Sequence, residues 1–521
     1  MITEDQQNVV TYLSSPAAHG GNAVERIDTH ASILFLAGER AWKLKRAVRY
    51  DYLDYSTADQ RRSMCEAEVR INRRTAPALY RGVAAVTRQA DGSLAIGGAG
   101  TAVDWLVEMA RFDQSGLLDR LAEAGVLPLS CMGPLAETIA RFHHHAAGGV
   151  EHGGWEAMRR VVDGNAEGFA KDAAGILDPI TCARLTDRTR FALDRVGTLL
   201  DERRDKDMVR QCHGDLHLRN VVLLDGQPTL FDAIEFNDDI SSIDVLYDLA
   251  FLLMDLWRLE LPHHANVLWN AYLNETADLD GLPLMPLFLS CRAAVVAKTT
   301  ATAANLQSDA DRRAELQVLA NEYLTMAGTL LDPPPPLLIA VGGLSGSGKS
   351  TLAMALAPSM GAPPGAVVVR SDEIRKKQCG VKPLARLGPE GYSNGVSRRV
   401  YATLMDHANT VVRGGYTAIA DAVFAESSDR DAVQHVAAAA GVPFIGLWLE
   451  APVPLLVSRV EGRAQDVSDA GTEVIWRQLA YRLDSLRWHR INASGTRQQV
   501  CEAVMAIVGS SLTAWPATVR K

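Results

Sequence analysis

The chain has 521 residues, of which 47% are apolar and 22% are charged. This composition is that of an ordinary globular protein and excludes a disordered or fibrous one, and the length is enough for two to four domains. The seven cysteines lack the spacing of a zinc site or a disulfide framework, so we expect a reducing, cytoplasmic setting. No stretch combines the length and the apolarity of a membrane span, and we expect no association with a membrane.

The first part of the chain predicts a small, strand-rich lobe. Residues 33–45 alternate as a hairpin of two strands around a turn, and residues 57–74 predict a helix. We place this lobe at residues of about 1–105.

A mostly helical lobe follows, at residues of about 106–332. One hairpin interrupts it at 221–231, where the turn Asp225-Gly226-Gln227-Pro228 joins two short apolar strands. The predicted architecture of residues 1–332 is therefore an α+β fold with two lobes.

A polar loop directly before this hairpin carries the pattern of a kinase catalytic loop. It reads His213-Gly214-Asp215-Leu216-His217-Leu218-Arg219-Asn220, and Asp232 follows the second strand of the hairpin. An Asp can accept the proton of an attacking hydroxyl, while the amide oxygen of an Asn and a second carboxylate are suitable Mg²⁺ ligands.

This loop resembles that of the aminoglycoside phosphotransferase and choline kinase-like superfamily, H-G-D-x-H-x-x-N. The resemblance implies that Asp215 is the catalytic base and that Asn220 and Asp232 bind Mg²⁺. Asp248 is similar to a structural Asp of that superfamily, and Glu235 is a candidate for a third carboxylate at the metal.

The same resemblance implies an ATP site in the strand-rich lobe. Lys43 is similar to the strand lysine that holds the ATP phosphates, with Glu68 as its helix partner; Lys45 and Glu66 are the alternatives. By position, Glu108-Met109 is the hinge that lines the adenine. The run His143-His144-His145 cannot chelate one ion, since adjacent helical residues point in different directions, and we expect solvated or loop-facing side chains.

Four prolines at 333–336 predict a stiff linker between a helix and a buried strand. We therefore predict a domain junction there, with a second domain at 337–521. The second domain has 20 Lys and Arg against 15 Asp and Glu, a net charge of +5, whereas the residues before it have a net charge of −14. This balance suits a phosphate-rich ligand in the second domain; nucleic acid is possible as a partner but not favoured, and nothing indicates an oligomeric state.

The second domain opens with a phosphate-binding loop of the Walker A type. The motif G-x-x-x-x-G-K-[ST] lies between an apolar strand and a helix, where backbone N–H groups and the helix N-terminus hold phosphates. Its lysine reaches the outer phosphates and its serine binds Mg²⁺. We predict ATP-binding residues at Gly343, Leu344, Ser345, Gly346, Ser347, Gly348, Lys349, Ser350 and Thr351.

The next two strands of this domain end in acidic residues. After the strand at 366–370, Asp372 is placed to take a proton from an acceptor hydroxyl, or to cap the following helix, and Arg375 to bind an anionic substrate group. After the strand at 416–420, Asp421 is a candidate second ligand for Mg²⁺.

A predicted helix at 455–463 carries Arg459 and Arg463 on one face, as a lid over ATP or as a solvated basic surface. This half resembles P-loop kinases of the zeta toxin, polynucleotide kinase and gluconate kinase type, and the order of the two halves resembles a bacterial two-domain family. We therefore predict a multidomain protein, α+β and then α/β with a parallel sheet.

The predicted function is an ATP- and Mg²⁺-dependent kinase with two sites. Each transfers the γ-phosphate to a hydroxyl of a small molecule such as a sugar, an amino sugar or a nucleoside. The alternatives are a polynucleotide 5′-hydroxyl kinase in the P-loop half and a nucleotide-sensing regulatory protein.

Overall fold

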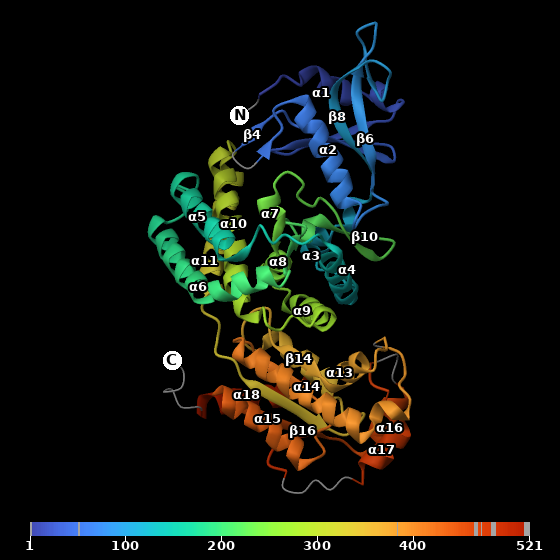
Figure 1. Cartoon of the computed structure of the whole chain (residues 1–521), viewed down its shortest axis with the longest axis vertical. Coiled ribbons are helices and arrows are strands. Elements are labelled where there is room, and N and C mark those ends of the chain that lie inside the picture. The colour runs from blue at the N-terminus through green and yellow to red at the C-terminus, as the bar shows by residue number, and fades with distance from the viewer. Residues whose placement is uncertain are drawn as a thin grey trace. The chain divides into compact units, whose positions relative to one another are not determined.

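The computed structural model describes residues 3–50, 53–382, 384–462, 467–469, 471–480 and 486–514. The chain forms two compact units. Unit 1 consists of residues 1–164 and 193–255, and unit 2 of residues 165–192 and 256–521. Figure 1 labels their helices and strands.

Unit 1 begins with a six-stranded antiparallel sheet in the order β1-β2-β3-β8-β6-β7. Helix α2 (Ala58–Asn72) packs against β6 and β8 (Figure 1), and Thr57 begins this helix with a capping box to Gln60. The predicted hairpin and helix are confirmed, while β8 continues past the expected end of the lobe. The strands are β1 (Val24–Asp28), β2 (Ser32–Ala37), β3 (Arg40–Lys45), β6 (Tyr80–Arg88), β7 (Leu94–Ile96) and β8 (Thr101–Ala110), with a separate pair β4 (Arg49–Tyr50) and β5 (Leu53–Asp54).

The rest of unit 1 is helical with short strand pairs. The predicted hairpin is confirmed as β10 (Val221–Leu224) and β11 (Gln227–Leu230); Asp225 and Gly226 both have positive φ, as its two-residue turn requires. Helix α1 (Gln7–Leu13) precedes the sheet, and α5 (Gly154–Lys171), α6 (Pro179–Asp205) and α8 (Val245–Arg258) each cross a boundary between the two units. The other elements of this part are α3 (Leu118–Glu123), α4 (Met132–His145), β9 (Val209–Gln211), α7 (Asp238–Ser241) and β12 (Ser242–Asp244).

Unit 2 contains a five-stranded parallel sheet in the order β14-β15-β13-β16-β17. The central strand β13 is buried along its whole length, which explains its continuous apolar sequence. Helices α12 (Lys349–Leu356) and α18 (Arg497–Ala514) pack apolar side chains against the sheet. The predicted fold class, α+β followed by α/β with a parallel sheet, is confirmed. The strands are β13 (Leu338–Gly343), β14 (Val367–Arg370), β15 (Ala418–Asp421), β16 (Phe444–Glu450) and β17 (His489–Asn492).

Five more helices surround this sheet and three precede it. The five are α13 (Ser371–Gln378), α14 (Asn394–Arg413), α15 (Ser427–Ala440), α16 (Val453–Glu461) and α17 (Thr472–Gln478). Those that precede the sheet are α9 (Pro262–Thr276), α10 (Met285–Leu306) and α11 (Ala310–Leu330).

Unit 2 thus includes helices that precede the four prolines in the chain. The prolines themselves lie in neither a helix nor a strand. The junction at 333–336 therefore stays a proposal. Among the described residues, Leu282–Leu306 is a stretch long and apolar enough to cross a membrane, but 67% of its apolar window is buried inside the protein.

Candidate active sites

In unit 1, a buried carboxylate anchors the start of the polar loop. Asp248, on α8, accepts the backbone N–H groups of His213, at 3.1 Å, and Gly214, at 2.8 Å. Its Oδ2 also lies 3.1 Å from Nε2 of His143, which is buried and loop-facing, whereas His144 and His145 are exposed. The loop therefore has a rigid base just before Asp215.

Asp215 is held from two sides within this loop. The amide nitrogen of Asn220 donates to its backbone oxygen and to its Oδ2, both at 3.0 Å, and His217 Nε2 lies 3.2 Å from Oδ2. Burial by itself would raise the pKa of Asp215, but His217 and the charge of Arg219 outweigh burial and hold this pKa well below its ordinary value. The carboxylate is thus kept ionised, as a proton acceptor must be.

Two lysines of β3 share one glutamate of α2. Lys43 Nζ lies 2.9 Å from Glu68 Oε1, and Lys45 Nζ lies 2.6 Å from Glu68 Oε2. Burial would lower the pKa of both lysines, but the carboxylates around them raise it well above its ordinary value. The structure therefore distinguishes the two lysines, since Lys43 also contacts Asp232, at 2.6 Å, and Lys45 does not.

Lys45 lies on a different, closed side of this cluster. Its Nζ is 2.5 Å from Glu235 Oε1, which also accepts a hydrogen bond of 2.6 Å from the Tyr55 hydroxyl. All three side chains are almost fully buried. Glu235 is thus engaged by Lys45 and Tyr55, which argues against its use as a third metal ligand.

Asp232 is at the open side of the cluster. Its side chain is 43% exposed, and its backbone has a φ of 62°, a conformation that Asp tolerates. Its N–H donates to the Tyr80 hydroxyl at 3.1 Å, and the next N–H, of Ala233, donates to Oδ1 of Asn72 on α2 at 2.8 Å. These bonds aim a carboxylate outward beside Lys43. The amide nitrogen of Asn220 donates to Asp215, and its amide oxygen accepts no hydrogen bond among the described residues. Carboxylate and amide oxygens are both groups that Mg²⁺ accepts as ligands.

The predicted hinge residues lie inside β8. Glu108 pairs through its backbone with Trp42 of β3, and its side chain lies 3.3 Å from Arg40. Met109 belongs to the apolar core beneath the sheet. Their role at the adenine stays a prediction.

In unit 2, the loop between β13 and α12 packs closely against the backbone at Leu456. Gly346 has a φ of 81°, and a Cβ there would lie 2.5 Å from the backbone oxygen of Leu456, so only glycine fits. Ser345 N–H donates to Gln478 Oε1 at 2.8 Å, and Lys349 Nζ donates to Leu344 O at 3.1 Å. The buried Ser347 Oγ has no hydrogen-bond partner within the described part of the chain.

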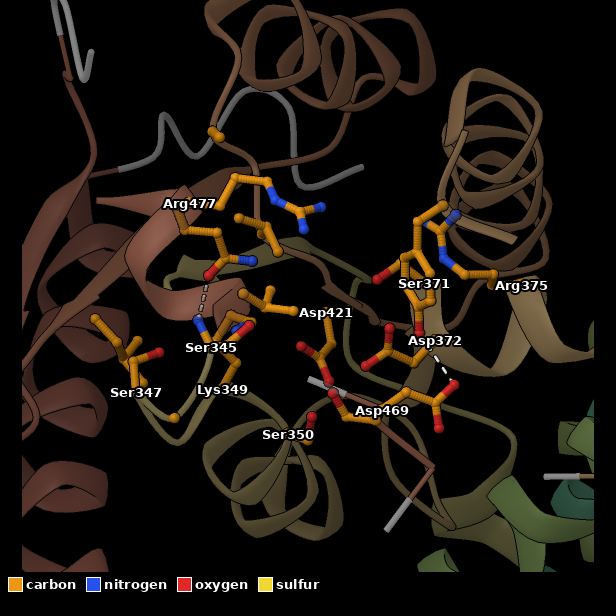
Figure 2. Close-up of a pocket in the computed structure, with 18 of the residues that line it drawn as sticks. Ser345, Ser347, Lys349, Ser350, Ser371, Asp372, Arg375, Asp421, Asp469 and Arg477 are labelled. Carbon is orange, nitrogen blue, oxygen red and sulfur yellow. Dashed lines mark hydrogen bonds between the residues drawn. The ribbon is translucent and has the colours of Figure 1, made fainter. Parts of the chain in front are cut away.

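This loop opens into a cavity of about 1600 Å³. Figure 2 shows Asp372 and Asp421 pointing into the same cavity as Lys349 and Ser350. The cavity also gathers residues from segments far apart in the sequence, among them Ser371, Arg375, Tyr392, Tyr401, Asp429, Arg459, Asp469, Arg477 and Arg497.

Asp372 differs from Asp215 in its electrostatic setting. Burial, and next the charge of Asp421, raise the pKa of Asp372 above its ordinary value. A hydrogen bond with Ser468, and next the charges of Lys349 and Arg370, counteract this rise only in part. The two carboxylates therefore repel each other, and a cation between them would relieve that repulsion.

Arg375, on α13, is held at the wall of the cavity. Its Nη1 donates to Gly391 O at 2.8 Å and lies 3.3 Å from Ser397 Oγ, and its guanidinium lies 4.9 Å from the centre of the Tyr392 ring. Within the described residues its buried Nε has no partner. The side chain is thus fixed in position with a donor to spare.

Sequence reasoning missed a second anchor at this wall. Asp469 accepts from Lys376 Nζ at 2.7 Å, from Leu387 N–H at 2.9 Å and from the Tyr392 hydroxyl at 3.1 Å. No signal could have found it, because its partners are about 80 to 90 residues away in the chain.

The described residues include one of the two arginines that we predicted to form a lid. Arg459 borders the cavity and donates to Ala493 O at 2.9 Å. Arg463 lies outside the described residues.

Comparisons with known proteins agree with this arrangement. Residues 338–484 match the family model AAA_33, described as an AAA domain. Over 480 residues the chain is 27% identical to the uncharacterized protein Rv2004c of Mycobacterium tuberculosis, and the match covers 91% of this chain and 93% of the relative.

Two solved structures are similar to parts of the chain. An ethanolamine kinase of Plasmodium vivax is 14% identical, with 63% of this chain and 90% of its own covered and a TM-score of 0.37. A sugar kinase of Janibacter sp. HTCC2649 is 20% identical, with 36% of this chain and 99% of its own covered and a TM-score of 0.26.

The predicted architecture is confirmed: an α+β region precedes a C-terminal P-loop domain with a parallel sheet, and the AAA_33 family model matches within that domain.

Proposed function

We propose that the chain is an ATP- and Mg²⁺-dependent kinase with two separate sites, each of which phosphorylates a hydroxyl of a small molecule. The observation that supports this most is that each unit brings a lysine, a candidate base and a candidate metal ligand together from distant segments. In unit 1 Lys43 contacts Asp232, 189 residues away, beside the Asp215 loop. In unit 2 Lys349, Asp372 and Asp421 border one cavity.

In unit 1, Asp215 accepts the proton of the attacking hydroxyl. Asn220 and Asp232 hold Mg²⁺ through their oxygens, and Lys43, fixed by Glu68, holds ATP phosphates. Because Asp215 is kept ionised, this base is ready across the neutral pH range.

In unit 2, the Gly343–Ser350 loop holds the ATP phosphates through its backbone N–H groups and Lys349. The buried Ser347 Oγ, which has no partner among the described residues, fits a phosphate oxygen, and Ser350 and Asp421 fit Mg²⁺. Asp372 accepts the proton of the acceptor hydroxyl, and Arg375, which borders the same cavity, binds a polar group of the acceptor.

ATP supplies the transferred phosphoryl group and Mg²⁺ neutralises its developing charge when both are bound. The acceptors that we propose are sugars, amino sugars or nucleosides, and the setting is the cytoplasm. The acidic first part of the chain suits a cationic acceptor such as an amino sugar at the unit 1 site.

An ATP-consumption screen over sugars, amino sugars, nucleosides and 5′-hydroxyl oligonucleotides tests this function. Asp215→Ala and Lys349→Ala should each remove one acceptor-dependent activity and leave the other. The exposed residues Asp187 and Lys382 provide the matched controls Asp187→Ala and Lys382→Ala, which should act like the parent. A double variant, Asp215→Ala with Lys349→Ala, that consumed ATP at the parent rate would contradict the proposal.

A further inference from the structure

The side chain of Asn270, on helix α9, hydrogen-bonds to the backbone at the edge of the unit 2 sheet, as a residue of a neighbouring strand would. Asn270 Nδ2 donates to Ala366 O at 3.1 Å, and its Oδ1 accepts the N–H of Val368 at 2.7 Å. A carboxamide offers donor and acceptor groups side by side, as the backbone of a strand does. It therefore satisfies two backbone groups, one in β14 and one just before it, that point away from the neighbouring strand.

A second asparagine, one helical turn earlier, extends this contact. Asn266 Nδ2 donates to Pro364 O at 3.2 Å and to Ala366 O at 3.1 Å. The approach is so close that a Cβ on Gly365 would lie 2.6 Å from that nitrogen. Both asparagines thus lie on the face of α9 that meets the segment leading into β14.

An aromatic contact fixes the same helix to the sheet. The buried ring of Trp269 lies 6.2 Å from that of Tyr416, and the Tyr416 hydroxyl donates to Pro363 O at 2.9 Å. The position of α9 is therefore set by packing as well as by hydrogen bonds, and its amides are aimed at β14 by a rigid support.

Strand β14 leads directly into the start of α13, which carries the proposed base of the P-loop reaction. β14 is at the edge of the sheet, with β15 as its one strand neighbour, and it ends at Arg370, two residues before Asp372. A shift of the strand would move the carboxylate relative to the phosphates, and misplacement of a catalytic group by about 1 Å can cost on the order of 100-fold in rate.

We infer that Asn270 is a positioning residue for Asp372, and that helix α9 is a working part of the P-loop kinase. This inference rests on the proposed role of Asp372. It makes residues before the four prolines necessary for the second reaction, which the sequence assigns to 337–521 alone.

The Gly343–Ser350 loop follows the central strand β13, whereas Asn270 contacts the edge strand β14. We call the hydrogen bonds of Asn270 to the backbone of Ala366 and Val368 the clamp. Loss of the clamp should therefore lower the turnover of the acceptor and leave nucleotide binding unchanged. A general loss of folding would reduce both.

Hydrogen exchange on the full-length protein tests the clamp directly. Asn270→Ala should raise exchange in the segment 364–370 by about tenfold, since it removes a hydrogen bond that protects Val368 N–H. Asn270→Gln keeps the carboxamide and should recover part of the protection, and Asn266→Ala should give a smaller rise. Asn274→Ala is the matched control, one turn further along the helix, where the described residues show no hydrogen bond from the side chain.

The second measurement is the rate with the acceptor found by the screen. Asn270→Ala should lower kcat for the P-loop reaction about 10- to 100-fold, with the Kd for a fluorescent ATP analogue unchanged, and Asn270→Gln should recover part of the rate. Parent-like exchange and kcat in Asn270→Ala would overturn the inference, as would an equal effect of Asn274→Ala.

The proposed base can fail separately. If Asp372→Asn kept the parent kcat while Asn270→Ala increased exchange in 364–370, the proposed role of Asp372 would be wrong, and the positioning inference would fall with it. The clamp itself would then remain a structural contact.

Discussion

The two candidate sites balance their charges in different ways. Around Lys43 in unit 1, the charged groups meet opposite charges of the protein itself: Glu68 lies between two lysines, and Glu235 closes the far side. In the cavity of unit 2, Asp421 has an ion pair with Arg370 at 3.4 Å, but its charge still raises the pKa of Asp372, and the buried Ser347 Oγ lacks a partner among the described residues.

The two folds thus provide in different ways for the phosphoryl transfer that we propose at both sites. Unit 1 forms its site from ion pairs between its own side chains. The protein therefore sets the geometry of the site, and these ion pairs offset the cost of desolvating the charges. Unit 2 offers donors and carboxylates that gain most from a bound anion and cation, so the ligand completes the site. We therefore expect variants in unit 1 to affect stability as well as rate, and variants in unit 2 mainly to affect binding and rate.

The largest effect should follow from neutralising the base of unit 1. Asp215→Asn keeps the shape of the side chain but cannot accept a proton, and general-base catalysis contributes about 10²- to 10⁴-fold. We expect a loss of that size in kcat for the unit 1 acceptor and no change for the P-loop acceptor, measured by product formation. Equal losses in both reactions would contradict the proposal that the two sites are separate.

A large effect on stability should follow from removing the buried lysine of unit 1. Lys45→Met leaves Glu68 and Glu235 buried near each other without their shared cation, and breaking a buried pair costs about 3–5 kcal/mol. Denaturant unfolding, followed by signals from unit 1, measures this cost. Lys206→Ala is the control, because its exposed ion pair with Glu202 should contribute about 0.5 kcal/mol or less. A parent-like midpoint for Lys45→Met would mean that the cluster does not support the fold.

The two reactions should separate on acidification. The pKa of Asp215 is held low, so it stays ionised as the pH falls, whereas the pKa of Asp372 is raised, so it gains a proton at a higher pH than an ordinary Asp. The ratio of P-loop activity to unit 1 activity should therefore decrease toward acid pH, in kcat/KM profiles of the two acceptors. A ratio that stayed constant or increased would contradict these settings.

The smallest effect concerns the edge of the buried cluster. Tyr55→Phe removes the hydroxyl that donates to Glu235 but leaves Lys45 in place, and a hydrogen bond to a charged group contributes about 1.5–3 kcal/mol. The same unfolding experiment should show a smaller shift than Lys45→Met. If the two shifts were equal, or in the opposite order, Lys45 would not be the centre of the cluster.

The sequence predicted what is encoded in contiguous residues. The loops at His213–Asn220 and Gly343–Ser350 could be identified because each chemical group has a set spacing within one turn or strand, and the strands around them follow from apolar periodicity. The pairing of Glu235 with Lys45 could not be predicted, since these residues are 190 positions apart and either lysine of β3 fits the motif. The clamp of α9 on β14 was missed because asparagine on a helix gives no signal of what it will contact.

The central claim, two separate nucleotide sites in one chain, is tested most directly by counting bound nucleotide. Titration of the full-length protein with a non-hydrolysable ATP analogue and Mg²⁺, followed by calorimetry or native mass spectrometry, should show two molecules per chain. It should show one in Lys349→Ala, one in Lys43→Ala, and none when both changes are combined. A single molecule bound to the parent chain, or two still bound in either single variant, would contradict the account.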